Sequence, residues 1–397
     1  MREVVVVDSI RTGLGKSFKG ALNATRPDDM LAHVIKEMIN RHPNIPLDEI
    51  DDVVMGCAFP EGAQGLNIAR IAAMLAGLPV TVPGQTINRF CSSGSQAITA
   101  AANQIISGGQ DIIFAGGVET ITMIDDGSRN TNHMVNPAVK ENFPALYWIM
   151  GRTAEVVADR YDISRQQQDE YALMSQERTA LAQTNGLFAD EIVPMSVTKK
   201  IIPKDADPYS EDLILDVDEC NRPDTTIDGL ADLPSVFTKD GSGSVTAGNS
   251  SQFSDGASVT VLMSADKAKE LNIEPLGIYR GTYVTGLEPD EMGLGPLKAV
   301  PKLLELHGKS VDDIDLWELN EAFAVQVVHC ANELGIDFNK LNVNGGAISV
   351  GHPYGVTGSR VTGHLLRELK RQEKRWGVVT MCVGGGQGFA SLFEANI

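Results

Sequence analysis

The 397-residue sequence lacks any run of about 20 apolar residues, the length that a helix needs to cross a bilayer. Its N-terminus also lacks the succession of basic, apolar and small residues that marks a secretory signal. Its five cysteines are an odd number without paired spacing, which argues against a disulfide framework and suits a reducing compartment. We therefore expect a soluble protein of the cytoplasm, without membrane insertion.

Positive charge is scarce, because 33 Lys and Arg stand against 52 Asp and Glu, a formal net charge of -19. Nucleic acids and anionic membranes bind clustered Lys and Arg, so neither is an expected partner. The sequence has no His-Glu-x-x-His run and no paired Cys-x-x-Cys, so we expect no metal. The stretch "GLGKS" imitates a phosphate loop, but Ile10 stands where the first glycine is required.

Strand and helix patterns alternate along the chain. Strand-like apolar runs at 4–7, 112–115, 259–263 and 378–382 are separated by amphipathic or Ala-rich helical runs. This alternation predicts an α/β protein with helices on both faces of its sheets, and the length favours two or more packed units. Between 121 and 250 the pattern changes to turn formers and acids around one good helix, 165–184. We expect a large excursion from the core there, a lid or loop domain.

Two distant segments share one order of elements. "SSGSQAITAAANQIISGGQDIIFAGG" and "VTGSRVTGHLLRELKRQEKRWGVVTMCVGG" both run Gly-Ser, helix, strand, Gly-Gly. Chance can produce such a likeness in an α/β protein, so duplication and coincidence both stay open at this point. If duplication holds, two similar halves face each other and the site lies between them.

Cys91 lies in "NRFCSSGSQA", between a strand-like run at 80–87 and a helix predicted over 97–106. The start of a helix is electropositive, and such a position lowers the pKa of a thiol and favours the thiolate. A lone cysteine is more often a buried small apolar residue, and that alternative stays open from these residues alone. The Gly, Ser and Asn residues around it shift the interpretation towards function.

Three further residues stand at predicted strand ends, where the ligands of α/β sheets gather. His352 lies in a turn between a glycine and a proline, either as a solvated side chain or as the base that a thiol needs. Cys382 ends a strand before "VGGGQG", whose glycines allow close approach to a ligand or form a simple turn. Asn320 opens a helix-like run, either as an N-cap or as an amide that holds a water or a carbonyl oxygen.

Taken together, "NRFCSSGSQA", "NEAFA", "NVNGGAISVGHPYGVTGSR" and "CVGGGQG" resemble the signature segments of the thiolase family, in the family's order and spacing. "SVTAGNSSQFSDGA" and "DEMGLGP" resemble lesser segments, so the likeness covers essentially the whole chain. It implies two duplicated halves of βαβαβαββ type in a five-layered α-β-α-β-α fold with an inserted loop domain. By this resemblance the N-terminal half is 1–120 with 251–271, the loop domain 121–250, and the C-terminal half 272–397.

The resemblance also implies the chemistry of the site. Cys91 would be the nucleophile that takes the acyl group of a 3-ketoacyl-CoA, His352 its base, and Cys382 the acid that protonates the leaving carbon. Asn320 would hold a water that stabilises the enolate oxygen with His352, and the N–H groups of Cys91 and Gly384 would form a second oxyanion hole. No bound cofactor is implied, and CoA enters as a co-substrate. The positions expected to contact CoA are Arg222, Ala247, Ser251 and Met150.

Three departures from the family pattern bear on the substrate. Ile149, before Met150 and Gly151, replaces a His that biosynthetic acetoacetyl-CoA thiolases commonly carry, which favours the degradative type and longer 3-ketoacyl chains. Gly229 stands at a CoA contact that is usually Ser, and Tyr354 is bulkier than the usual aliphatic residue. The expected function is thiolysis of 3-ketoacyl-CoA in fatty-acid β-oxidation; the alternative is an acetoacetyl-CoA thiolase working in the condensing direction.

Two other kinds of function share this fold. A non-catalytic lipid carrier would not need both cysteines and the histidine, and a decarboxylating condensing enzyme would pair one cysteine with His-His or His-Asn. The family also implies a homo-oligomer, a homodimer or homotetramer, whose small-molecule partners are acyl-CoA and CoA. A hydratase and dehydrogenase of β-oxidation would be a further partner.

Overall fold

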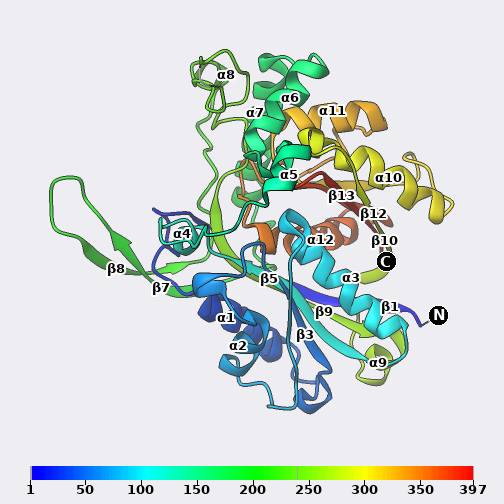
Figure 1. Ribbon diagram of the computed structural model, residues 1–397. Helices are drawn as coiled ribbons and strands as arrows, with labels where there is room; N and C mark the ends of the chain where they lie inside the picture. Colours follow the sequence, from blue (N-terminus) through cyan, green and yellow to red (C-terminus); the bar gives the residue numbers. More distant parts are fainter. Residues whose placement is uncertain (1, 239, 397) are drawn as a thin grey trace.

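The computed structural model describes residues 2–238 and 240–396. Within them the chain folds into five alternating layers of helices and strands, which Figure 1 shows from α10 and α11 at the upper right to α1 and α2 at the lower left. No helix in these two stretches is long and apolar enough to cross a membrane.

The first sheet has the strand order β4-β3-β5-β9-β1. β4 and β5 run parallel to β3, whereas β9 is antiparallel to both β5 and β1. The long strands are buried on both faces, which explains why they read as apolar runs without alternation. The strands are β1 (Val4–Thr12), β3 (Asp52–Gly56), β4 (Gln85–Ile87), β5 (Ile112–Glu119) and β9 (Ser254–Ser264), and β2 (Gly15–Lys16) pairs with the start of β9.

The second sheet repeats this order as β11-β12-β13-β10. β11 and β12 are parallel, and β13 is antiparallel to both β12 and β10. A single bridge from Trp317 to Leu341 stands where the first half has β4, and β1 pairs with β10 to join the two sheets. Both halves thus follow βαβαβαββ, which confirms the predicted duplication. The strands are β10 (Gly277–Gly286), β11 (Leu316–Leu319), β12 (Trp376–Val383) and β13 (Gln387–Ala395).

Three layers of helices enclose the sheets, and each has its own apolar core, so the prediction of helices on both faces is confirmed. The outer helices of the first sheet are α1 (Pro27–Arg41) and α2 (Ile68–Leu75), and those of the second are α10 (Gly295–Leu306) and α11 (Ala324–Leu334). α3 (Ser93–Ile106) and α12 (Tyr354–Arg371) lie side by side between the sheets (Figure 1). The short α9 (Ala265–Glu270) follows β9.

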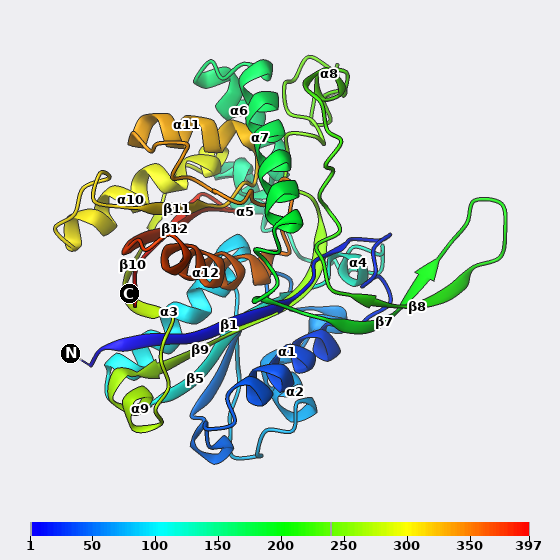
Figure 2. The same cartoon turned by 180° about the vertical axis from the view of Figure 1, so that it is seen from behind.

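Between β5 and β9 the chain leaves the first sheet, in the region predicted as an excursion. The helix predicted there is α7 (Arg165–Thr184), whose start is fixed by a capping box of Ser164 and Gln167. This prediction is confirmed; shorter helices accompany α7, and a hairpin projects from the body (Figures 1 and 2). The bounds 121–250 of a loop domain stay a prediction. The other elements are α4 (Ile121–Ile124), α5 (Pro137–Asn142), α6 (Met150–Arg160), α8 (Ile227–Ala231), β6 (Ile192–Val193) and the hairpin strands β7 (Met195–Ile201) and β8 (Tyr209–Leu215).

Two element boundaries near candidate residues differ from the prediction. The strand expected over 80–87 is limited to β4, because Pro79 and Pro83 have no N–H to donate to a sheet. The helix after Asn320 begins only at Ala324, with Phe323 in extended conformation as its N-cap residue. Asn320 is therefore not an N-cap.

Glycines bring α3 and α12 into backbone contact at their first turns. A Cβ atom on Gly94 would lie 2.7 Å from the carbonyl oxygen of Gly355 and 2.9 Å from the nitrogen of Ser359. A Cβ atom on Gly358 would lie 2.9 Å from Cα of Ser95. Side chains do not fit at such distances, so glycine is required for the close approach of the two backbones. The two halves of the chain thereby meet at the starts of these helices.

Gly94→Ala is expected to destabilise the protein by about 1 to 3 kcal/mol, the usual cost of overpacking, even though Ala favours a helix more than Gly does. Urea unfolding followed by circular dichroism measures the change. Gly109→Ala is the control, because a Cβ there meets nothing within 4 Å. Equal stability of the two variants would contradict the packing argument.

Candidate active site

The candidate residues gather where the first turns of α3 and α12 meet the carboxyl ends of β5 and β12. Cys91 lies in a 3-10 turn (Phe90–Ser92) directly before α3, and His352 lies directly before α12. Cys382 is near the end of β12, and Gly384 is in the turn to β13. Segments that are far apart in the sequence thus contribute candidate residues to one small region of the structure.

The turn that carries Cys91 is fixed by its own polar residues. The side chain of Asn88 accepts a hydrogen bond from the N–H of Phe90 at 2.8 Å, and that of Ser93 accepts one from the N–H of Arg89 at 2.9 Å. Phe90 has a φ of 42°, in the left-handed region that a bulky residue adopts only where its surroundings enforce it. The composition of "NRFCSSGSQA" therefore holds Cys91 in one defined conformation.

The thiol of Cys91 faces the backbone of the glycine turn after β12. The backbone N–H groups of Gly384 and of Cys91 itself lie near its sulfur and lower the pKa of the thiol. A Cβ atom on Gly384 would lie 3.5 Å from Sδ of Met150 and 3.7 Å from the ring of Phe90. The structure thus brings Cys91, Gly384 and Met150 together.

The expectation that the helix start favours a thiolate at Cys91 is wrong. Burial raises the pKa of this thiol to about 11, and the two N–H donors lower it by less. The carboxyl group of Glu119 adds to the rise. Cys91 is therefore a neutral thiol at neutral pH and needs a base to become a nucleophile.

His352 is buried with both ring nitrogens engaged. Nδ1 lies 2.7 Å from Oγ1 of Thr357, whose own proton goes to the carbonyl oxygen of Pro353 at 3.1 Å. The Thr357 oxygen therefore accepts from Nδ1–H, which leaves Nε2 unprotonated, 3.3 Å from Nδ2 of Asn320. Burial lowers the pKa of His352 to about 3, so the neutral ring can accept a proton at Nε2.

Tyr354 lies between these two groups. Its ring packs edge-on against His352 with centroids 5.0 Å apart, and Cys91 adds to the effect of burial in raising the pKa of its hydroxyl. Within the described residues no hydrogen bond joins Cys91 to His352. The thiol and the imidazole therefore both lie near Tyr354, without a preformed proton bridge.

Asn320 and Cys382 are buried on neighbouring parallel strands, just beyond β11 and near the end of β12. Oδ1 of Asn320 has no hydrogen-bond partner in the described part of the chain, so this oxygen is open to bind a water. The thiol of Cys382 donates to Oε1 of Gln326 at 3.5 Å. Burial raises the pKa of Cys382 well above its ordinary value, and the nearby Cys91 adds to the rise.

The other positions predicted to contact CoA are Ser251, Ala247 and Arg222, and their role stays a prediction. Ser251 is followed by Gln252, whose carbonyl oxygen accepts from the N–H of His352 at 2.9 Å. Ala247 and Arg222 are exposed. Among the described residues no group of three or more His, Cys, Asp or Glu side chains is placed to hold a metal ion.

The sequence matches two family models that together cover nearly the whole chain. The thiolase N-terminal domain matches residues 4–266, and the thiolase C-terminal domain matches residues 273–395. The chain belongs to the thiolase family.

Relatives of this thiolase family member align over almost its full length. It is 47% identical over 396 residues to the 3-ketoacyl-CoA thiolase of Bacillus subtilis (strain 168), with 99% of this chain and 100% of the relative covered. It is 44% identical to the peroxisomal 3-ketoacyl-CoA thiolase B of Mus musculus, with 99% and 91% covered. Two solved structures each superpose with a TM-score of 0.88 over 100% of this chain and 99% of theirs: the acetyl-CoA acetyltransferase of Bacillus anthracis at 40% identity, and the human mitochondrial 3-ketoacyl-CoA thiolase at 35%.

Sequence reasoning missed three residues that support the candidate ones in this thiolase. Thr357 fixes the tautomer of His352, Gln326 accepts from Cys382, and Glu119 lies among backbone N–H groups near Cys91. The only signal was a threonine one helical turn into α12 after a turn histidine. The other two roles depend on burial, which no local pattern reveals.

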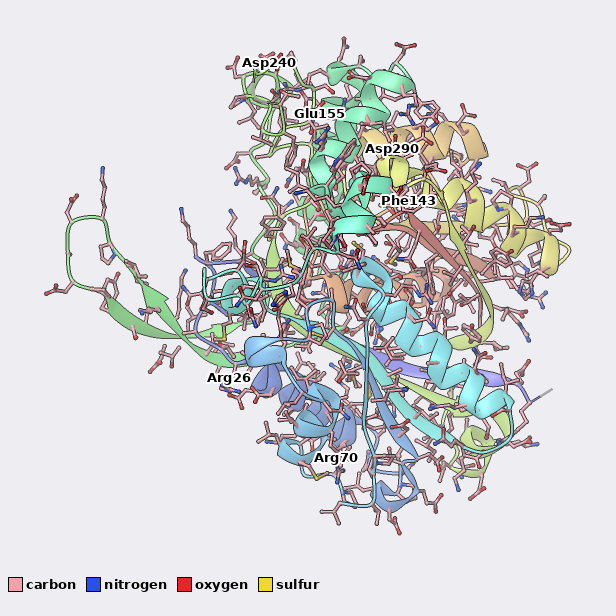
Figure 3. All side chains as sticks on the ribbon, viewed as in Figure 1. Arg26, Arg70, Phe143, Glu155, Asp240 and Asp290 are labelled. Atoms are coloured by element: carbon pink, nitrogen blue, oxygen red, sulfur yellow. The ribbon has the colours of Figure 1, made fainter. Side chains whose placement is uncertain are left out.

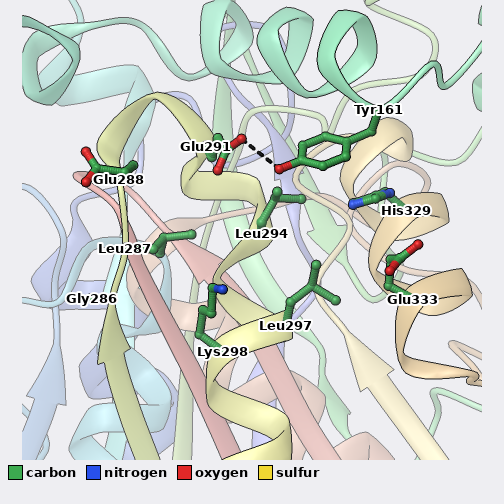
Figure 4. A pocket seen from close by; sticks show the side chains of 10 residues that line it. All are labelled: Tyr161, Gly286, Leu287, Glu288, Glu291, Leu294, Leu297, Lys298, His329 and Glu333. Atoms are coloured by element: carbon green, nitrogen blue, oxygen red, sulfur yellow. Dashed lines mark hydrogen bonds between the residues drawn. The ribbon is translucent and has the colours of Figure 1, made fainter.

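A cavity of about 480 Å³ borders the site but is lined by none of the candidate residues (Figure 4). The hydroxyl of Tyr161 donates to Glu291 there at 2.7 Å, and the ring of His329 packs on Tyr161 with centroids 4.2 Å apart. The cavity adjoins the glycine turn, because the N–H of Leu287 donates to the carbonyl oxygen of Gly386 at 2.9 Å. It is acidic and does not suit the phosphates of CoA; its charged lining residues are Glu288, Glu291, Glu333 and Lys298.

Alkylation of Cys91 by iodoacetamide is expected to accelerate about tenfold per pH unit between pH 7 and 9, because only the thiolate reacts and the pKa lies near 11. Mass spectrometry of the peptide that contains Cys91 measures the rate. Protein unfolded in urea is the control, since a thiol with the ordinary pKa of about 8.5 levels off soon above that pH. A plateau below pH 8 in the folded protein would indicate a stabilised thiolate.

Proposed function

We propose that this thiolase family member cleaves 3-ketoacyl-CoA with free CoA to acetyl-CoA and a shortened acyl-CoA in fatty-acid β-oxidation. The observation that carries the proposal is the meeting of a thiol, a neutral imidazole, a second thiol and the N–H groups of a glycine turn, supplied by Cys91, His352, Cys382 and Gly384. The Bacillus subtilis, mouse and human relatives are named 3-ketoacyl-CoA thiolase.

In the first half-reaction Nε2 of His352 accepts the proton of Cys91 while the sulfur attacks C3 of the substrate. The N–H groups of Cys91 and Gly384 would then bind the oxygen of the tetrahedral intermediate. Its collapse breaks the C2–C3 bond, leaves the acyl group on Cys91 as a thioester and puts the electron pair on the enolate of acetyl-CoA. Cys382 gives its proton to C2 and becomes a thiolate.

The enolate oxygen needs stabilisation of its own, because the enolate is otherwise a poor leaving group. The partnerless Oδ1 of Asn320 supports a bound water there, whose proton would point to the enolate oxygen. The imidazolium formed at His352, 3.3 Å from Asn320, would add a positive charge beside it. Two donors would thus share the developing charge.

In the second half-reaction CoA enters as co-substrate and gives its thiol proton to the thiolate of Cys382. The CoA sulfur attacks the acyl carbon, and the sulfur of Cys91 leaves and takes back its proton from His352. One thioester is exchanged for another, so the transfer is close to isoenergetic and reversible. No resident cofactor takes part in this proposed sequence.

Exposed apolar side chains near the glycine turn favour substrates with acyl chains longer than acetoacetyl. Apolar side chains are exposed along residues 134–149, among them Phe143 at 57% (labelled in Figure 3) and Ile149 at 64%. Cδ2 of Leu146 lies 3.5 Å from the Cβ position of Gly385, next to the glycine turn that faces Cys91. Such an apolar surface suits an acyl chain. The 40% identity to the Bacillus anthracis acetyl-CoA acetyltransferase supports the alternative, an acetoacetyl-CoA thiolase working in the condensing direction.

We also propose a cytoplasmic homodimer or homotetramer. β4 is a partly exposed edge strand, and such an edge is suited to be covered by a second copy. All five cysteines are free, as suits a reducing compartment. Acyl-CoA and CoA are the proposed small-molecule partners, and a hydratase and dehydrogenase of β-oxidation are the proposed protein partner.

The purified protein is expected to consume 3-ketoacyl-CoA when CoA is added, measured by mass spectrometry over several chain lengths. Cys91→Ala is expected to lower turnover by about 10⁴-fold or more with an unchanged circular dichroism spectrum. Without CoA, an acyl mass shift is expected on the peptide that contains Cys91. No substrate loss at any length would refute the proposal, and activity on acetoacetyl-CoA alone would establish the alternative.

Leu146→Asn is expected to lower kcat/KM for 3-ketododecanoyl-CoA by about tenfold, the contribution of one buried leucine contact, and for acetoacetyl-CoA by less than about twofold. The short substrate does not reach this side chain. Leu306→Asn is the matched control, an exposed leucine at the end of α10. Equal losses for both substrates would place the acyl chain elsewhere.

A further inference from the structure

Glu119, the last residue of β5, is a fully buried carboxyl group that the proposed mechanism does not use. The N–H groups of Ala58 and Gly355 donate to its Oε2 at 2.8 and 2.9 Å. The N–H of Phe59 and Nε2 of Gln64 donate to its Oε1 at 3.3 and 2.6 Å. These donors match an ionised carboxylate, although burial raises the pKa of Glu119.

One of these bonds reaches the second half of the chain. Gly355 is in the first turn of α12, directly after the segment that carries His352. The same glycine is pressed against the first half, because a Cβ there would lie 2.6 Å from the carbonyl oxygen of Gly56 and 3.1 Å from Cα of Cys57. Glu119 therefore fixes the end of α12 from which His352 projects.

The bonds to Ala58 and Phe59 fix a loop that supports Cys91. The carbonyl oxygen of Ala58 accepts from Nδ2 of Asn88 at 2.9 Å, and Asn88 holds the turn before Cys91 through the N–H of the next residue but one. Glu119 also adds to the raised pKa of Cys91, as expected for a nearby carboxylate. One side chain thus connects the supports of the thiol and of the imidazole.

We propose that Glu119 is a positioning residue that holds the start of α12, and with it His352, in register with the turn that carries Cys91. The proposal rests on the proposed function. Proton transfer needs Cys91 and His352 within hydrogen-bond reach, and a displacement of about 1 Å at such a contact costs about 100-fold in rate. Because the two groups belong to different halves, their register is set across the interface that Glu119 spans.

Loss of the Glu119 charge has two effects of opposite sign on Cys91. It lowers the pKa of the thiol, so that alkylation, which needs no protein base, becomes faster. Loss of register slows the reaction that needs His352. A general loosening of the fold would instead expose every buried cysteine, including Cys330 in α11.

The test is Glu119→Gln, which keeps the shape of the side chain but replaces the carboxylate that accepts from Nε2 of Gln64 by an amide. We expect kcat for 3-ketoacyl-CoA thiolysis to fall about 10- to 100-fold, with KM for CoA within about twofold. Alkylation of Cys91 at pH 8 is expected to be about threefold faster, and alkylation of Cys330 unchanged. Asp51→Asn is the matched control, because Asp51 accepts two backbone N–H bonds at the opposite end of β5; both rates should stay unchanged.

Two outcomes would overturn the positioning role: unchanged turnover of Glu119→Gln, or a parallel acceleration of Cys330 alkylation. Each outcome is compared with the unsubstituted protein, which must itself catalyse thiolysis. If the unchanged protein shows no thiolysis, it is the proposed function that fails. The two failures are therefore distinguishable.

Discussion

The backbone contact between the first turns of α3 and α12 is the constraint on which the candidate site depends. The outer cores of the two halves are separate, and the inner layer is built by these two helices together. Each helix begins just after a candidate residue, Cys91 for α3 and His352 for α12. Backbone atoms cannot move aside by changing rotamers, so contact through Gly94 and Gly358 fixes the spacing of the helix starts more firmly than side-chain packing would. The duplicated sheets bring the helices near each other, and the glycines decide how near.

A buried set of charges ties the excursion between β5 and β9 to this frame. Arg11 of β1 donates to Asp218 and Glu191, and Glu191 in turn accepts from His364 of α12. Burial alone would raise the pKa of Glu191, but the contacts with His364 and Arg11 outweigh it and hold the pKa of this carboxyl well below its usual range. Removal of one member would leave a buried charge without its partner, at a cost of about 3 to 5 kcal/mol. The excursion, which carries predicted CoA contacts, is therefore anchored to β1 of the first half and to α12 of the second half.

Much of this arrangement could be predicted where a short pattern has one structural meaning. α7 was predicted with its true bounds, and the structure shows that a capping box fixes its start. Both the duplication and the four candidate stretches were visible because glycine and polar residues stand at corresponding strand ends. Where several meanings compete, the sequence could not decide: Asn320 has the residue type of an N-cap, yet the chain stays extended through Phe323. The roles of Glu119 and Gln326 depend on which backbone groups and thiols the fold buries beside them, and the same burial reversed the expected shift at Cys91.

The neutral state of Cys91 and His352 determines how the proposed chemistry can begin. With a pKa of about 11 for the thiol and about 3 for the imidazole, a standing thiolate and imidazolium pair lies strongly uphill. Proton transfer is therefore expected to accompany formation of the sulfur–carbon bond rather than to precede it. The N–H groups of Cys91 and Gly384, which lie near the sulfur in the resting state, would bind the oxyanion once the sulfur has attacked, and low polarity strengthens those bonds. The same burial that keeps the resting thiol of Cys91 neutral thus strengthens the stabilisation of the charge that develops on the substrate. The thiol is therefore expected to become an effective nucleophile only when a substrate carbonyl group is bound.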